Sequence, residues 1–175
     1  NQRYVKKDSP AENNLATINA RAVEPFYNLL CAGEERNKKY VGSKTLDAGD
    51  ILQTLAGWTV IGEGKSRIPR RIPLFGQKRD FRDKMSETSK AAHAMDKALG
   101  ELSLTCEPKN AGRALYLVTA PPKEMKMEVI KQLGDNLKTV APDALIRSGD
   151  YPRQKGSLDV SVILSEISSV RKITN

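Results

Sequence analysis

Residues 113–119, Arg-Ala-Leu-Tyr-Leu-Val-Thr, form a segment that is almost continuously apolar. A strand with this composition is typical of the centre of a sheet, because both of its faces must be covered by other elements. We therefore expect a layered fold in which helices pack on a sheet that contains this strand.

Three segments have the three-and-four spacing of apolar residues that predicts an amphipathic helix. They are residues 13–35, where Pro25 would kink or break the helix, residues 81–102, and a helix that opens at Pro121-Pro122 and closes at Ala141-Pro142. The expected apolar stripes are Leu15, Ile18, Ala22, Phe26, Leu29 and Leu30; Met85, Ala92, Met95, Leu99 and Leu102; and Met127, Ile130, Leu133, Leu137 and Val140.

Three further segments predict strands. Residues 58–62, which begin with Trp58, form a β-branched and aromatic run that predicts a buried strand. Residues 143–148 predict a short strand, residues 149–156 a polar loop, and residues 157–165 a strand with one buried face that could pair antiparallel with the strand before it. The expected fold is α/β (α+β), a mixed four-stranded sheet packed with helices and preceded by a long connecting helix.

An acidic stretch, residues 44–51, carries Asp47 and Asp50 just before a short helix that we expect from Ala48 to about Leu55. This helix start would make Asp47 the N-cap and Asp50 the N3 residue, and its positive end favours both charges. Two interpretations stay open. The carboxylates either cap the helix, or they form a presented pair of anions that orients a water or a cation.

Most of the chain's net charge of +8 comes from one basic segment, residues 64–84, which alone carries +6. Pro69, Pro73 and Gly76 interrupt this segment, which predicts an exposed loop at residues 64–80. The rest of the chain is near neutral, which argues against a uniformly basic protein. The basic residues are Lys65, Arg67, Arg70, Arg71, Lys78, Arg79, Arg82 and Lys84.

The cysteines and the histidine argue against a metal site of the kind these residues form. Cys31 and Cys106 lie far apart, and with His93 as the single histidine they offer no metal-ligand set.

No apolar run is long enough to cross a bilayer and no signal-peptide pattern is present, so we expect a cytoplasmic protein. Residues 1–12 predict a flexible tail or linker, and because the first residue is Asn1 we expect a piece of something longer.

The order of these elements, together with several short segments, resembles the C-terminal domain of the FtsZ and tubulin superfamily, and most of all its archaeal, FtsZ/CetZ-type branch. Residues 46–51, Leu-Asp-Ala-Gly-Asp-Ile, are similar to the family's Leu-Asp-Phe-Ala-Asp-Val loop. Residues 57–64 resemble the first strand, 91–99 an alanine-rich helix, and 114–120 the strand before the last helix.

This resemblance implies that residues 13–42 are a connecting helix and turn, and that residues 43–175 are the C-terminal domain of a cytoskeletal GTPase. Asp47 and Asp50 would enter the GTP site of the next subunit in a filament and position the water that attacks the γ-phosphate. GTP and Mg²⁺ would be bound by a GTPase domain outside this chain, so the fragment alone is expected to be inactive. Thr45 departs from the family's usual Asn.

The resemblance also suggests a role for the basic loop, because tubulin makes lateral contacts between filaments at this place. The loop would make such contacts or bind an acidic partner; the alternative is a solvated, disordered insertion. Its candidate contact residues are Lys65, Arg67, Arg70, Arg71, Lys78 and Arg79. The expected partners are other subunits and the GTPase domain of the same or the adjacent subunit, in cell division or another cytoskeletal process.

Two other classes of function stay open from the residues alone. A stand-alone nucleic-acid-binding protein could use residues 64–84, with Phe75 and Phe81 stacking on bases. An unrelated small α/β enzyme could use Asp47 and Asp50 with a metal.

Overall fold

The computed structural model describes residues 11–32, 34–68, 81–154 and 156–168. The helices are α1 (Ala11–Ala32), α2 (Ala48–Thr54), α3 (Phe81–Gly100) and α4 (Met127–Val140), and the strands are β1 (Val60–Arg67), β2 (Ala111–Ala120), β3 (Leu145–Pro152) and β4 (Ser157–Ile167). The predicted α/β fold with a mixed four-stranded sheet is therefore confirmed. The expected tail falls almost wholly outside the described residues, as does most of the basic loop.

The sheet has the strand order β1-β4-β2-β3, with β4 antiparallel to both of its neighbours and β2 parallel to β3. The predicted central position of β2 is correct, but the predicted hairpin between the last two strands is wrong. Strand β4 is buried on both faces, including Asp159 and Ser161. These polar side chains made the strand resemble one with a solvent-exposed face, although Asp159 lies beside Glu24 of helix α1.

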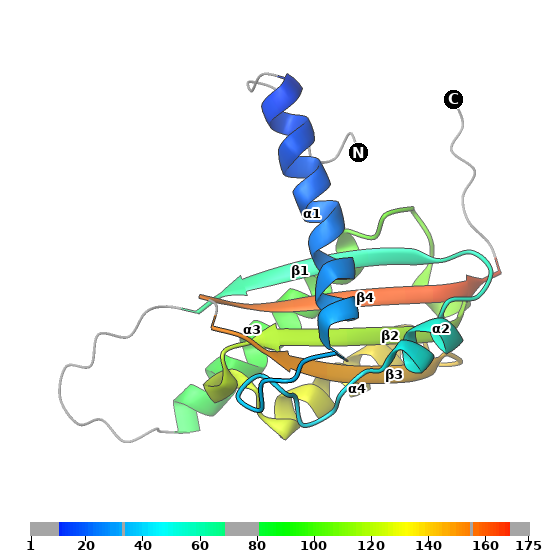
Figure 1. Ribbon diagram of the computed structural model, residues 1–175. Helices are drawn as coiled ribbons and strands as arrows, with labels where there is room; N and C mark the ends of the chain where they lie inside the picture. The colour runs from blue at the N-terminus through cyan, green and yellow to red at the C-terminus, as the bar shows by residue number, and fades with distance from the viewer. Residues whose placement is uncertain (1–10, 33, 69–80, 155, 169–175) are drawn as a thin grey trace.

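Helices pack on both faces of the sheet (Figure 1). Helices α3 and α4 cover one face, where alternate residues of β2 such as Ala114 and Tyr116 are buried. Helices α1 and α2 lie on the other face, where Leu115 and Leu117 pack against Leu29 of α1. This two-sided burial explains the continuous apolar sequence of β2.

Helix α3 packs closely on β1 through small residues. Its buried side chains include Ala91, Ala94, Met95 and Ala98, while Ala92 and Leu99 of the expected stripe are only partly buried. His93 is exposed. These small residues let the helix backbone approach Gly62 and Gly64 of β1 closely. The helix therefore buries its alanine-rich face, and not the face that the spacing of the expected stripe indicated.

The ends of three other elements differ from the predictions. Strand β1 begins at Val60, so Trp58 lies before it and is 65% exposed rather than buried. Helix α4 begins at Met127 after a 3₁₀ turn at Pro122–Glu124, which leaves Met127 exposed. Strand β3 continues through Asp150 to Pro152, so the predicted polar loop is wrong in its first half.

Helix α1 continues through Pro25 without a break and projects past the β1 edge of the sheet (Figure 1). Leu29 is buried, but Leu15, Phe26 and Leu30 of the expected stripe are exposed. None of the described helices is long and apolar enough to span a membrane.

Candidate functional site: an acidic loop docked on strand β3

Asp47 and Asp50 form a reciprocal capping box at the start of α2. The Asp50 amide donates to Asp47 Oδ1 at 2.7 Å, and the Asp47 amide donates to Asp50 Oδ2 at 3.3 Å. Asp47 is exposed and Asp50 is half-buried. The predicted cap is therefore confirmed, and it holds the two carboxylates side by side at the positive end of the helix.

Two arginines from the sheet hold α2 in place. Arg147 of β3 pairs with Asp50 (Nε to Oδ1, 3.3 Å) and donates to the side chain of Gln53 at 2.6 Å. Arg113 of β2 donates to the Gln53 carbonyl at 2.5 Å and pairs with Glu166 at 2.9 Å. Arg147 therefore fixes the helix at its acidic end. Arg113 fixes it at the C-terminal end, where the unpaired backbone carbonyls favour a nearby cation.

The loop before α2 is fastened by Asp150, which is 2% exposed. Its carboxylate accepts the amide of Ser43 at 2.9 Å and the amide of Lys44 at 2.5 Å. The Asp150 amide in turn donates to the Lys44 carbonyl at 2.9 Å. Gly42 is required beside this contact, because a Cβ there would overlap the Asp150 backbone.

Two further contacts join the same loop to β3. Leu46 is fully buried and packs on Gly149, where an added Cβ would lie 2.5 Å from Leu46 Cγ. The Lys44 ammonium donates to Ser148 Oγ at 2.6 Å. We call residues 42–50 the acidic loop; it presents two ordered carboxylates, which can accept hydrogen bonds from a water and orient it.

Among the predicted basic residues, the two that the structure describes do not join this site. Lys65 and Arg67 lie on edge strand β1, whereas the acidic loop docks on the opposite edge strand, β3, at a distance of roughly 14 Å across three strand spacings. Arg70, Arg71, Lys78 and Arg79 lie outside the described residues, as does Phe75. The lateral contact and the nucleic-acid alternative therefore stay predictions.

Lys65 instead belongs to a cluster of charges between α1 and the sheet. Its ammonium lies 2.6 Å from Glu24 of α1, 3.5 Å from Glu63 and 4.0 Å from Asp159. Burial pulls the pKa of Lys65 down, but the Glu24 hydrogen bond and the three carboxylates outweigh this effect and raise it overall. The three carboxylates could share a metal ion by their spacing, but the Lys65 ammonium already lies among them.

Glu63 is the perturbed member of this charge cluster, with a side chain that is only 11% exposed. Burial raises the pKa of Glu63 to about 7; the nearby Glu24 and Asp159 carboxylates add to the rise and Lys65 opposes it.

Sequence reasoning missed Asp150, Arg147 and this cluster. Asp150 lies in the predicted polar loop of residues 149–156, but the structure places it in β3. The apolar Tyr151 directly after Asp150 was the available signal that the strand continues.

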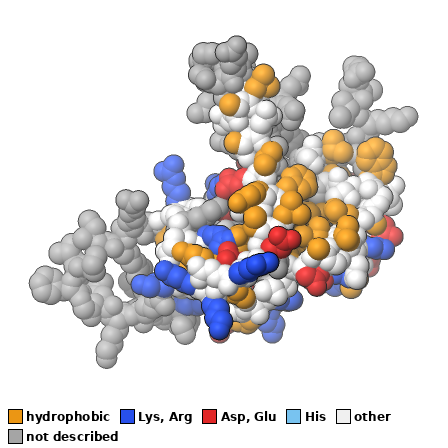
Figure 2. All heavy atoms as spheres, in the orientation of Figure 1, with side chains coloured by type: hydrophobic (Ala, Val, Ile, Leu, Met, Phe, Trp, Pro, Cys, Tyr) orange, Lys and Arg blue, Asp and Glu red, His pale blue; other side chains and the backbone are white. Residues whose placement is uncertain are grey.

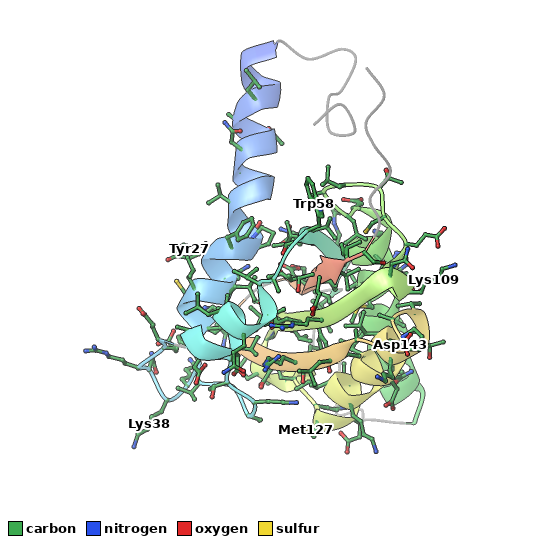
Figure 3. All side chains as sticks on the ribbon, turned by 90° about the vertical axis from the view of Figure 1, so that its right-hand side faces the viewer. Tyr27, Lys38, Trp58, Lys109, Met127 and Asp143 are labelled. Atoms are coloured by element: carbon green, nitrogen blue, oxygen red, sulfur yellow. The ribbon has the colours of Figure 1, made fainter. Side chains whose placement is uncertain are left out.

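Exposed apolar side chains gather on the face that carries α1 and α2 (Figure 2). We call these residues the apolar face: Val23, Phe26, Tyr27 and Leu30 of α1, Leu52 of α2, and Leu55 and Trp58 after it. Figure 3 shows Tyr27 pointing from α1 away from the sheet. A contiguous surface of this kind is typical of an interaction site.

Comparisons with known proteins agree with the fold. The family model described as the C-terminal domain of tubulin-like CetZ matches residues 9–175. Tubulin-like protein CetZ1 of Haloferax volcanii is 27% identical over 187 residues, which cover 99% of this chain and 47% of that protein. CetZ3 of the same organism is 26% identical over 181 residues, which cover 99% and 46%. The chain thus spans slightly less than half the length of these relatives.

Solved structures give the same result. CetZ2 from Haloferax volcanii, described as a GTPγS-bound protofilament, has a TM-score of 0.73 at 16% identity, over 98% of this chain and 46% of that one. The FtsZ dimer of M. jannaschii has a TM-score of 0.66 at 16% identity, over 93% and 41%. At these identities the structural likeness shows a shared fold.

Proposed function

The chain belongs to the family of tubulin-like CetZ C-terminal domains, and from this premise we propose that it is the C-terminal half of a cytoplasmic, filament-forming GTPase. In this proposal its acidic loop completes the GTP site of the neighbouring subunit. GTP and Mg²⁺ would be held by a nucleotide-binding half that lies outside this chain.

The observation that carries the proposal is the capping box of an exposed Asp47 and a half-buried Asp50 on a loop that is fastened to β3. Phosphoryl transfer to water depends mainly on positioning and electrostatics, so a fixed pair of carboxylates beside a phosphate suits the reaction. A water between them and the γ-phosphate would donate hydrogen bonds to the carboxylates and direct its lone pair at phosphorus. Asp50 stays oriented by Arg147 during this step.

The apolar face supports the same proposal. It runs along one side of α1 and extends to α2, so it offers a surface for a nucleotide-binding half outside this chain and for the next subunit. Covering exposed side chains such as Phe26, Leu30 and Leu52 would stabilise these contacts, because each apolar side chain contributes about 1–2 kcal/mol when it leaves water.

The protein that contains both halves provides the test. Asp47→Asn keeps an N-cap side chain and Asp50→Asn keeps the shape, while each removes one negative charge. We expect GTP turnover at polymerising concentration to fall ~100-fold or more in each variant, with nucleotide binding retained.

The matched control is Asp143→Asn, which changes an exposed aspartate in the turn between α4 and β3 (Figure 3). This variant should turn over GTP like the unmodified protein. Unchanged turnover in both acidic-loop variants would reduce Asp47 and Asp50 to a helix cap.

A further inference from the structure

We propose that Asp150 is the positioning residue of the acidic loop: its buried carboxylate fixes the loop to β3 and thereby sets where Asp47 and Asp50 lie. The consequence for GTP turnover rests on the proposed function above, whereas the consequence for the order of the loop does not.

The geometry is that of a carboxylate bound in a small anion-binding concavity. The two oxygens of Asp150 accept two successive amides, those of Ser43 and Lys44, at 2.9 and 2.5 Å. Hydrogen bonds to a charged acceptor are about twice as strong as neutral ones. Asp150 is only 2% exposed, so water has little access to its carboxylate. Loss of the two amides would therefore leave buried acceptors without partners, which costs free energy.

The neighbouring residues of β3 show that this contact is part of a built docking surface. Strand β3 contributes Ser148 to the ammonium of Lys44, Gly149 to the side chain of Leu46, and Asp150 to two amides. Each contact takes a different chemical form, namely a polar side-chain bond, apolar packing and a charged clamp. Together they fix the loop in one register.

We call the hydrogen bonds from Ser43 and Lys44 to Asp150 the Asp150 clamp, and this clamp and the capping box fix different parts of the loop. The box fixes Asp47 and Asp50 relative to α2, whereas Asp150 fixes the start of the loop relative to the sheet. Asp47 lies three positions after Lys44 in the chain, a reach of at most about 10 Å. When the Asp150 contact is lost, Leu46 and the Arg113 and Arg147 contacts of α2 remain, so we expect the carboxylates to shift by only about 1 Å, which is enough to slow phosphoryl transfer.

The first experiment uses Asp150→Asn, which keeps the shape but replaces one acceptor oxygen with a donor that faces an amide N–H. We expect the Ser43 and Lys44 amides to exchange with solvent about 10-fold faster in this chain. Asp150→Thr suits the strand and retains one hydroxyl acceptor, so it provides a second variant with the same expected change. Ser148→Ala is the control: it removes the hydroxyl that meets the Lys44 ammonium and Tyr116, but it leaves the Asp150 carboxylate in place, so both amides should stay protected.

The second experiment measures GTP turnover in the protein that contains both halves. Both Asp150 variants should lower kcat by about 10-fold and leave the affinity for nucleotide and the extent of assembly unchanged, a split that general destabilisation would not produce. Unchanged amide exchange would overturn the clamp. Faster exchange with normal turnover would overturn the positioning role. Failure of the proposed function is read separately, from normal turnover in Asp47→Asn and Asp50→Asn.

Discussion

Gly64 of β1 lies directly against the backbone of α3, so that a Cβ built on it would overlap the carbonyl oxygen of Ala94. Gly62 has the same relationship to Ala98, one helical turn further along. The two glycines and the two alanines let the helix approach the strand more closely than larger side chains would allow. This close contact between helix and strand lies on the face of the sheet opposite to the acidic loop.

Substitution of Gly64 by alanine should therefore destabilise the chain. The new methyl group meets helix backbone, which cannot move aside as a flexible side chain can, so we expect a loss of about 3 kcal/mol in the free energy of unfolding. Denaturant unfolding measures this value. Gly156→Ala is the matched control, because open space surrounds Gly156, and it should unfold like the unmodified chain.

Glu63 predicts a pH dependence of stability. Its pKa is about 7 in the folded chain against an ordinary 4.5, so the unfolded state loses this proton first. The stability that neutral Glu63 contributes is fully present below pH 4.5 and is lost as the pH rises through 7. The difference corresponds to roughly 3 kcal/mol at high pH.

Glu63→Gln cannot ionise and isolates this effect. From pH 5 to pH 8 the unmodified chain should lose stability relative to Glu63→Gln in thermal or denaturant unfolding, because both proteins keep Lys65, Glu24 and Asp159 around the site and differ only at residue 63. Glu101→Gln changes an exposed carboxylate and should show no such pH trend. Parallel pH profiles for the unmodified chain and Glu63→Gln would contradict the prediction.

The sequence predicted the fold best where local chemistry determines the structure. The capping box of Asp47 and Asp50 needs only two side chains three residues apart, and the central position of β2 follows from its unbroken apolar run. The position of β4 depends instead on which helix covers Asp159 and Ser161, and no local pattern contains that information. The same limit hid Asp150, whose partners lie more than one hundred residues away.

The apolar stripe of α1 shows a different limit. Its spacing correctly predicted a helix, but Phe26 and Leu30 are exposed in this chain. Periodicity indicates that a face is apolar, and it does not reveal whether the covering surface belongs to the same chain.

Asp47 acts either only as a helix cap or also in GTP turnover, and a comparison of unfolding stability with turnover separates these two interpretations. Asp47→Ala removes the N-cap side chain and should cost about 1 kcal/mol in the free energy of unfolding, whereas Asp47→Asn retains an N-cap and should cost almost nothing. If the carboxylate acts only as a cap, GTP turnover in the protein with both halves follows the same order. Our proposal predicts that turnover falls strongly in both variants, so normal turnover in Asp47→Asn would contradict it.

Trp58, the single tryptophan, reports whether the apolar face is covered during assembly. It is 65% exposed and follows α2 in the chain, so this chain alone should emit at the wavelength of a hydrated indole and be quenched readily by iodide. In the protein with both halves, assembly with GTP should shift the emission to the blue and reduce quenching. Leu52→Asp changes a side chain that is 71% exposed, so it should fold normally and keep the emission of this chain, yet abolish the shift on assembly. An unchanged emission in filaments of the unmodified protein would place Trp58 outside the contact between subunits.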